Sequence, residues 1–229
     1  MACSRSRRHL LIPLHLTLAF HGTLLPSSAA DPPRTRGIFG ADDRIPVDSR
    51  RWPWQAIGIV QRRIGGACTG TLISPRVVLT AAHCTFDQRN GQALQPSELR
   101  FLPSSHSGPS PPPEAASAVT GIMRPSTGHG QSNPTLREML SDWALLVLIT
   151  PLPLSPIPLR VPRLPEGQPI ARAGFSQGRR LTLVPACRIL YRDPADRFWF
   201  TDCDTLAGDS GSPVLAGQGD GMGVVGVTS

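Results

Sequence analysis

Long apolar runs and C-x-x-C cysteine pairs are both missing from this 229-residue sequence. No stretch beyond the N-terminal region is apolar and long enough to span a bilayer, and the apolar run inside that region is too short to do so. The five cysteines show no C-x-x-C spacing, which argues against a structural zinc site. Aromatic residues make up only 5% of the chain. Ordinary hydrophobic content and modest charge predict a globular protein without metal or cofactor.

A strongly basic surface is also missing once the N-terminal region is set aside. The formal net charge is +7, but residues 1–36 carry +4 of it, which leaves +3 for the rest of the chain. Nucleic-acid binding would need a basic stripe or patch that matches the phosphate backbone. A remainder this weakly charged argues against nucleic acid as a partner.

The first 30 residues have the three parts of a secretory signal peptide. Arg5, Arg7 and Arg8 give a basic start, residues 10–20 are mainly apolar, and residues 28–30 offer the small side chains that a signal peptidase reads. We therefore expect a secreted or periplasmic protein that no longer contacts the membrane once residues 1–30 are removed. The polar, proline-containing residues 31–37 then read as a pro-segment.

Export implies an oxidising compartment, in which cysteines form disulfides. Cys3 leaves with the signal peptide, and the cysteines that remain are Cys68, Cys84, Cys187 and Cys203. Four cysteines allow three pairings, and spacing alone does not choose among them.

The mature chain divides into two strand-rich regions. Short apolar runs separated by glycine, proline and aspartate turns recur over residues 38–150 and again over 169–229. Residues 142–149 read as a buried strand, although periodicity alone also permits a helical turn. The proline-dense residues 151–168 forbid a helix or a central strand and predict an extended linker. Many short strands with such punctuation predict an all-β barrel or sandwich.

Three local motifs carry the chemistry. "LTAAHC" places His83 after an apolar strand, "SDWALLVL" places Asp142 at the head of another, and "GDSGSP" places Ser210 in a tight glycine turn. A serine hydroxyl is a poor nucleophile unless a neutral imidazole takes its proton. A buried carboxylate holds that imidazole in the productive tautomer and stabilises the imidazolium. These three residue types together predict nucleophilic acyl transfer.

Each motif taken alone also has an ordinary structural interpretation. A single histidine is usually a surface or satisfied core residue, and Asp142 could simply start a strand. After signal removal, however, only His106 and His129 compete with His83, and both lie in loop-like sequence. "GDSGSP" is specific by itself, since a chance turn of that composition is improbable.

Taken together, "LTAAHC", "DWALLVL" and "GDSGSP" resemble the triad motifs of the trypsin-like (chymotrypsin-fold) serine proteases, in that family's chain order. The resemblance covers residues 38–229 and implies an all-β fold of two antiparallel six-stranded β-barrels with the triad in the cleft between them. It also implies that Cys68 pairs with Cys84 and that Cys187 pairs with Cys203. The expected partners are polypeptide substrates and an activating protease, and the expected state is a monomer.

The resemblance further assigns an oxyanion hole and an activation pair. The N–H groups of Gly208 and Ser210 would stabilise the oxyanion. In the family, cleavage frees an N-terminal ammonium that pairs with the aspartate before the catalytic serine, here Asp209. "RTRGIFG" resembles such a cleavage site, although cleavage after Arg36 would free Gly37 rather than Ile38. Either residue could begin the mature enzyme; an uncleaved Arg36 is the alternative.

Substrate specificity remains open between two branches of the family. Asp204 lies where trypsin-like members carry the aspartate that selects arginine or lysine, and Ser229 would begin the strand that lines the pocket. "IFGADDR" and "DTLAGDSGSP" also resemble the bacterial branch that includes the glutamyl endopeptidases, where an aspartate at position 204 need not read substrate.

The chain stops at "GVVGVTS", before the last strands that the family normally carries. We therefore expect an incomplete second barrel. The leading prediction is a serine endopeptidase, and the alternative is a catalytically impaired, protease-like binding protein or a fragment.

Overall fold

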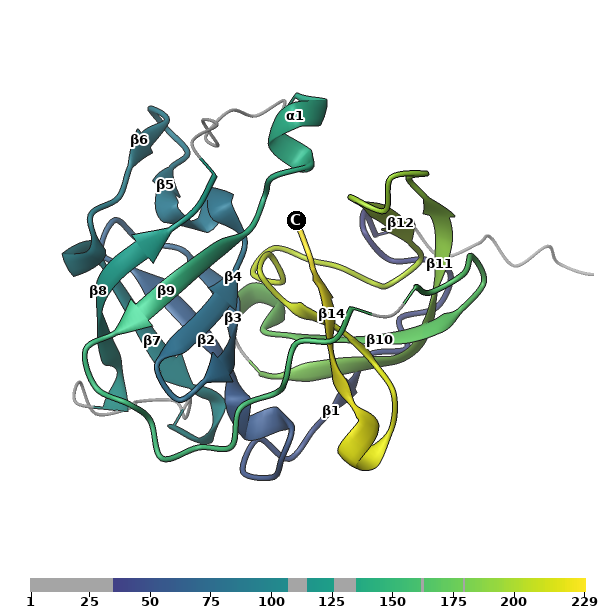
Figure 1. The fold of residues 1–229 in the computed structure, drawn as a ribbon, viewed down its shortest axis with the longest axis horizontal. Coiled ribbons are helices and arrows are strands. Elements are labelled where there is room, and N and C mark those ends of the chain that lie inside the picture. The colour runs from purple at the N-terminus through teal and green to yellow at the C-terminus, as the bar shows by residue number, and fades with distance from the viewer. Residues whose placement is uncertain (1–34, 107–114, 126–134, 162, 179) are drawn as a thin grey trace, which may run out of the picture. The chain divides into compact units, whose positions relative to one another are not determined.

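The structure is a computed structural model that describes residues 35–106, 115–125, 135–161, 163–178 and 180–229 (Figure 1). The predicted signal peptide and residues 31–34 of the predicted pro-segment lie outside the described residues. Residues 34–229 form one compact unit, so both strand-rich regions can be described together.

The first strand-rich region forms a closed, antiparallel, six-stranded barrel in the order β2-β3-β4-β9-β8-β7. Its strands are β2 (Ile57–Arg62), β3 (Ala67–Ser74), β4 (Val77–Thr80), β7 (Leu99–Pro103), β8 (Ser117–Met123) and β9 (Ala144–Leu148). A separate two-stranded hairpin, β5 (Phe86–Asp87) and β6 (Gln92–Ala93), follows the turn that carries His83. Residues 144–148 are thus a strand rather than a helical turn.

Alternating burial along the strands explains how the interior of the barrel is filled. Along β9, Ala144, Leu146 and Leu148 are buried, whereas the two residues between them are only half-buried. Successive side chains of a strand point to opposite faces, so one face fills the barrel and the other packs less closely. The run predicted to be a buried strand therefore has one fully buried face.

The second region forms an open six-stranded sheet instead of a second closed barrel. The order is β1-β11-β10-β13-β14, and β12 pairs with β11. Its strands are β1 (Ile45–Pro46), β10 (Pro169–Gly174), β11 (Thr182–Arg192), β12 (Trp199–Thr201), β13 (Pro213–Ala216) and β14 (Gly223–Val227). Within the described ranges no strand joins β14 to β12. The expected first barrel is confirmed, and the second region, predicted to be an incomplete barrel, is an open sheet among the described residues.

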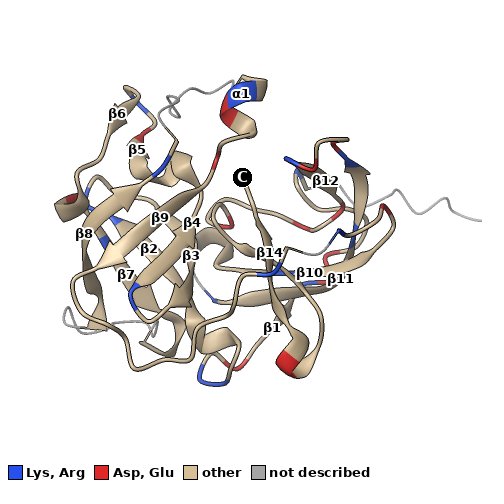
Figure 2. Ribbon diagram, in the orientation of Figure 1, with Lys and Arg blue, Asp and Glu red and all other residues tan. Residues whose placement is uncertain are grey.

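Short helices complete the described elements. They are α1 (Leu136–Met139) and the 3₁₀ helices η1 (Trp54–Ala56), η2 (Ala82–Thr85), η3 (Pro96–Glu98), η4 (Ser104–His106), η6 (Ser176–Gly178) and η7 (Gly219–Gly221). None of the helices in the described part of the chain could cross a membrane. In the view of Figure 2, basic and acidic residues are interspersed over both regions.

The proline-dense segment connects β9 to β10 in an extended form. Its Ile157 N–H donates to the Leu72 carbonyl of the barrel, and Arg160 N–H donates to the Val224 carbonyl of the sheet. Leu159 forms an isolated parallel bridge with Val224. The segment therefore contacts both regions. One cluster of buried apolar side chains likewise runs from barrel residues such as Leu146 to sheet residues such as Leu215.

Candidate active site

His83 and Asp142 come together through the pairing of β4 with β9. Thr80, which ends β4, lies opposite Ala144, which begins β9. His83 follows β4 in the short helix η2, and Asp142 lies two residues before the first residue of β9. The register of one strand pair therefore brings two residues 59 positions apart into contact.

The Asp142 carboxylate holds the histidine at two points. Its Oδ2 lies 2.6 Å from His83 Nδ1, and its Oδ1 accepts the His83 backbone N–H at 2.7 Å. The aspartate is 7% exposed, which shields this contact from water. Because Nδ1 is engaged, the other ring nitrogen is the one left to accept a proton from a nucleophile.

Burial alone would raise the pKa of Asp142, but its hydrogen bonds and the charge of His83 outweigh that effect and lower the pKa below its ordinary value. The Ser229 hydroxyl also donates to Asp142 Oδ2. Ser229, expected to line the substrate pocket, thus contacts the candidate triad itself. The carboxylate is charged at neutral pH, as the role of orienting an imidazole requires.

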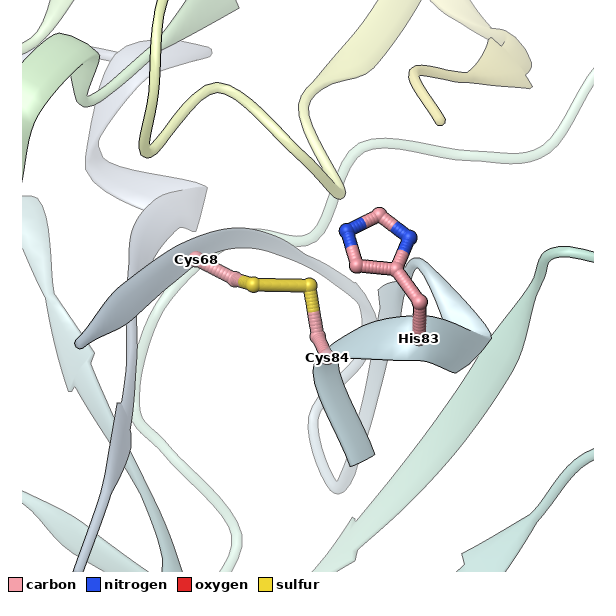
Figure 3. Close-up of side chains that lie close together, drawn as sticks. All are labelled: Cys68, His83 and Cys84. Carbon is pink, nitrogen blue, oxygen red and sulfur yellow. A yellow bond between two sulfur atoms is a disulfide. The ribbon is translucent and has the colours of Figure 1, made fainter. Parts of the chain in front are cut away.

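Cys84, next to His83, forms a disulfide with Cys68, and Cys187 forms another with Cys203. Figure 3 shows the first of these bridges beside the imidazole. The ligand atoms of Cys68, His83 and Cys84 lie within 4.8 Å of one another. The two sulfurs are bonded to each other, however, so they are not free thiolates that could hold a metal. The cluster braces the histidine turn.

The loop that carries Ser210 packs directly against the first barrel. Gly211 has φ +83°, and a Cβ at this position would lie 2.1 Å from the Thr69 carbonyl oxygen. Only glycine fits both the backbone conformation and the close approach. Thr69 N–H donates to the Ser210 carbonyl at 2.8 Å, and Thr69 Oγ1 donates to the Gly208 carbonyl at 2.9 Å.

Gly208 and Ser210 keep their own N–H groups available. Gly208 has φ +98°. Neither N–H donates within the described chain, whereas the neighbouring Asp209 N–H donates to the Leu206 carbonyl. Backbone donors must be free of other hydrogen bonds before they can serve an oxyanion site, and these two are. Among the described residues, the Ser210 hydroxyl makes no hydrogen bond to His83. Such bonds are often long before substrate binds.

The structure does not bring the expected activation pair together. In the uncut chain, Ile38 N–H donates to the Thr35 carbonyl at 3.0 Å. Asp209 instead lies 2.8 Å from the Arg172 guanidinium. The physical reason is that an amide nitrogen within a continuous chain carries no charge, and a buried carboxylate needs a cation.

Asp204 is buried, with 2% exposure, behind the Ser210 loop. Its Oδ1 accepts the Phe39 N–H at 2.7 Å, and its carbonyl accepts from Arg172 Nη2. Its Oδ2 is buried without a hydrogen-bond partner among the described residues. One carboxylate oxygen is thus committed to the N-terminal segment, and the other is free to receive a donor.

Two residues of the site were missed by the sequence analysis. Thr69, which joins barrel and sheet, lies in the apolar strand "ACTGTLIS" and carries no motif signal. Arg172 lies in "IARAGF" with apolar neighbours on both sides. A lone arginine inside an apolar strand indicates a buried ion pair, and this signal could have identified the residue.

Comparison with known proteins points to one family. A protein-family profile described as Trypsin matches residues 43–229. Phenoloxidase-activating factor 3 of Holotrichia diomphalia is 28% identical over 246 residues, covering 87% of this chain and 68% of that protein.

Two shorter matches come from differently described proteins. Glutamyl endopeptidase of Bacillus licheniformis is 38% identical over 66 residues, which cover 28% of this chain and 21% of that protein. Inactive serine protease 35 of Mus musculus is 36% identical over 61 residues, which cover 27% of this chain and 15% of that protein. The chain thus aligns with only a small part of these two relatives.

A solved structure described as Glu endopeptidase in complex with MPD has the same fold. The TM-score is 0.65 at 21% identity, over 83% of this chain and 86% of the other. A likeness at this identity concerns the fold alone. The predicted resemblance to the trypsin-like serine proteases is confirmed.

Proposed function

This chain belongs to the trypsin family of serine proteases, and from that premise we propose that it is an exported serine endopeptidase acting through His83, Asp142 and Ser210. The observation that carries the proposal is the two-point attachment of His83 to Asp142, at 2.7 Å and 2.6 Å. An imidazole held at Nδ1 and at its own backbone can act through its second nitrogen.

In the proposed reaction, His83 Nε2 takes the proton of the Ser210 hydroxyl as Oγ attacks the substrate carbonyl carbon. The oxyanion that forms accepts hydrogen bonds from the Gly208 and Ser210 N–H groups. The imidazolium, stabilised by Asp142, then protonates the leaving amine as the peptide C–N bond breaks. Water, deprotonated by His83, releases the acyl group from Ser210 in the reverse sequence.

The test is a matched pair of serine variants. Ser210→Ala should abolish labelling by a fluorophosphonate probe and reduce peptide hydrolysis to the level of residual binding and oxyanion stabilisation. Ser155→Ala, at an exposed serine of the linker, should behave as the unaltered chain. Equal hydrolysis by both variants would contradict the mechanism.

We propose that arginine or lysine precedes the scissile bond. The support is Asp204 Oδ2, which is buried without a partner among the described residues. A buried acceptor without a partner costs free energy, and a guanidinium or ammonium of the substrate would remove that cost through a charge-assisted hydrogen bond. A panel of peptides with Arg, Lys, Glu or Phe at this position tests it. We expect Asp204→Asn to lose the preference for Arg, and a preference for Glu would refute this role.

Export is proposed on two grounds. The N-terminal sequence has the parts of a signal peptide, and two disulfides suit an oxidising compartment. N-terminal sequencing of protein recovered from the periplasm and from the medium would test it, and retention of residues 1–30 would contradict it.

A second candidate is a protease-like binding protein without catalysis. The observation that favours it is the likeness to a relative described as inactive, 36% identical over 61 residues. In that case the folded chain would bind peptides, resist the fluorophosphonate probe and show no difference between Ser210→Ala and the unaltered sequence.

A further inference from the structure

Two half-buried arginines contact Phe86, at the end of the turn that carries His83. Arg62, the last residue of β2, donates from Nη1 to the Phe86 carbonyl at 3.5 Å. Arg124, the residue after β8, has its guanidinium carbon 4.6 Å from the centre of the Phe86 ring. Neither arginine has a role in the proposed reaction. We refer to Arg62, Phe86 and Arg124 together as the Phe86 site.

The Phe86 site is joined to the candidate triad through the backbone. Phe86 N–H donates to the His83 carbonyl, where η2 ends. The Arg62 guanidinium lies against the turn between β2 and β3, since a Cβ on Gly66 would lie 2.3 Å from its Nη2. That turn leads into the disulfide beside the imidazole (Figure 3). The site is therefore next to the histidine turn and not in a distant part of the barrel.

Neither guanidinium of the Phe86 site forms an ion pair within the described residues. Arg62 Nε is buried without a hydrogen-bond partner there, and no hydrogen bond of the Arg124 guanidinium is found there either. Burial lowers the pKa of both groups, and Asp87 alone acts against this, on Arg62. A cation that is partly removed from water is stabilised by a nearby anion. The site therefore has positive charge without a paired negative charge.

The acidic side chains of the barrel region are already paired with other arginines. Asp87 accepts from Arg89 Nε and Nη2, at 2.9 Å and 2.7 Å, and Glu98 accepts from Arg63 Nη2 at 2.6 Å. These are the two acidic residues of the described ranges 57–106 and 115–125, which also contain six arginines. An anion for the Phe86 site must therefore come from outside this region, and a bound ligand is the source that fits a site beside the histidine.

The proposed reaction sets the direction in which a substrate passes the site. The residue before the scissile bond faces Asp204 in the sheet region, and the leaving amine receives its proton from His83 in the barrel region. The residues after the scissile bond therefore run past the histidine turn and over the barrel, away from Asp204. Three residues of an extended chain span about 10 Å. Because Phe86 is hydrogen-bonded to His83, the first residues after the scissile bond reach the Phe86 site.

We propose that the Phe86 site binds the carboxylate of an aspartate or glutamate within the first three residues after the scissile bond of a polypeptide substrate. This inference rests on the proposed function and adds a second charge preference, opposite in sign to that of Asp204. Because the Phe86 ring holds Arg124 by its face, the N–H groups at the guanidinium edge remain free to donate to a carboxylate. Arg62 adds a second positive charge at the same phenylalanine.

The first experiment compares peptides that differ in one charge. Quenched fluorescent peptides share the preferred residue before the scissile bond and carry either glutamate or glutamine at the first, second or third position after it. At one of these positions glutamate should raise kcat/KM about tenfold over glutamine, the size of one charge-assisted hydrogen bond. This ratio should fall towards one between about 0.05 M and 0.5 M sodium chloride, because salt screens a partly exposed charge. A ratio near one at every position, or one that salt leaves unchanged, would overturn the inference.

Three matched variants locate the preference. Arg62→Gln and Arg124→Gln each remove one charge of the Phe86 site and should bring the glutamate-to-glutamine ratio close to one. Arg76→Gln removes the same charge from the exposed turn between β3 and β4 and should keep the ratio of the unaltered chain. Because the ratio compares two substrates of one variant, it does not change with the fraction of folded protein. A retained ratio in both site variants, or an equal fall in all three, would overturn the inference.

A binding measurement separates this inference from the proposed function. On the Ser210→Ala chain, fluorescence anisotropy should show the labelled glutamate peptide binding about tenfold more tightly than the glutamine peptide. Adding Arg124→Gln in the same background should remove the difference. Equal affinities would overturn the inference, whether or not the unaltered chain hydrolyses peptides. A difference in affinity without hydrolysis by the unaltered chain would support the site and contradict the proposed function.

Inorganic sulfate distinguishes a substrate carboxylate from a free anion. At constant ionic strength, sulfate should weaken binding of the glutamate peptide to the Ser210→Ala chain and leave the glutamine peptide unchanged. Equal weakening of both peptides would overturn the assignment of a substrate carboxylate to the Phe86 site.

Discussion

The closed barrel and the open sheet each supply part of the candidate active site, but they hold it by different means. His83 and Asp142 are placed by the register of β4 and β9, backed by apolar side chains such as Leu146 at 0% exposure. Ser210 lies in a loop held by a buried ion pair and by hydrogen bonds from Thr69. The barrel positions its residues by backbone pairing and packing. The sheet positions its loop by the Arg172–Asp209 ion pair and by hydrogen bonds from the barrel residue Thr69.

The difference follows from closure. A closed barrel satisfies every strand edge and buries one face completely, so apolar packing suffices. In the open sheet no strand joins β14 to β12 among the described residues, and the outer edge of β14 meets the linker through Val224. Its second cluster of buried apolar residues is small, and contains Ile170, Val184, Cys187, Ile189, Cys203 and Val214. We therefore expect changes on the two sides of the site to act differently on stability and on catalysis.

The largest effect is expected from the barrel side of the triad. Asp142→Asn should lower kcat about 10⁴-fold, the loss that this substitution causes in other serine-protease triads, because the amide favours the wrong imidazole tautomer. Steady-state kinetics with one peptide substrate measures the change. An unchanged melting temperature would show that the loss is catalytic, and a loss below tenfold would contradict the assigned role.

The two disulfides offer a matched comparison, since each closes a loop with a sequence separation of 16. Chain entropy predicts a similar loss of about 3 kcal/mol on removing either one. Cys68→Ala/Cys84→Ala should also lower kcat, because Cys84 adjoins His83. Cys187→Ala/Cys203→Ala should raise KM, because Cys203 adjoins Asp204. Denaturant unfolding and steady-state kinetics test the two double variants. Identical changes in kcat and KM for both would contradict the different roles assigned to the two disulfides.

Glycine substitutions test the contact between the two regions. Gly211→Ala should cost roughly 1–3 kcal/mol, since an alanine there has a strained backbone and meets Thr69. Gly121→Ala, on β8, is the control: its Cβ would lie 3.6 Å from Val147. We expect thermal unfolding to shift for Gly211→Ala alone, with a parallel fall in kcat. A tolerated Gly211→Ala would mean that the loop can move away from the barrel.

The smallest effects concern two ion pairs that are partly open to solvent. Asp87 in the barrel region and Asp196 in the sheet region each have a pKa lowered to about 2, chiefly by hydrogen bonds from Arg89 and Arg192. A lowered folded-state pKa stabilises the protein above the ordinary aspartate pKa, and this is lost as pH falls towards 2. Melting temperatures of Asp87→Asn and Asp196→Asn should approach that of the unaltered chain as pH drops from about 4 to 2. Because each pair keeps one residue in contact with solvent, Arg89 or Asp196, the differences should be small; equal differences at pH 7 and pH 2 would contradict their electrostatic origin.

Much of the site could be predicted from local sequence. The turn residues of "GDSGSP" and the strand before His83 are local features. A local pattern predicts the structure correctly when the surrounding fold favours the same conformation. Strand types and the extended linker segment followed from alternation and proline content. The strand order of the open sheet could not be predicted, since it depends on pairing between strands that are far apart in the chain.

By itself, the sequence determined the chemical groups: a histidine, an aspartate and a serine in motif context, four cysteines, and glycines at the turns. Only the tertiary structure decided how those groups are held. The cation that pairs with Asp209 is Arg172, 37 positions away in the chain, and no local motif joins the two residues. Burial creates the need for that cation, and burial is a property of the folded molecule, because a carboxylate in water needs no partner.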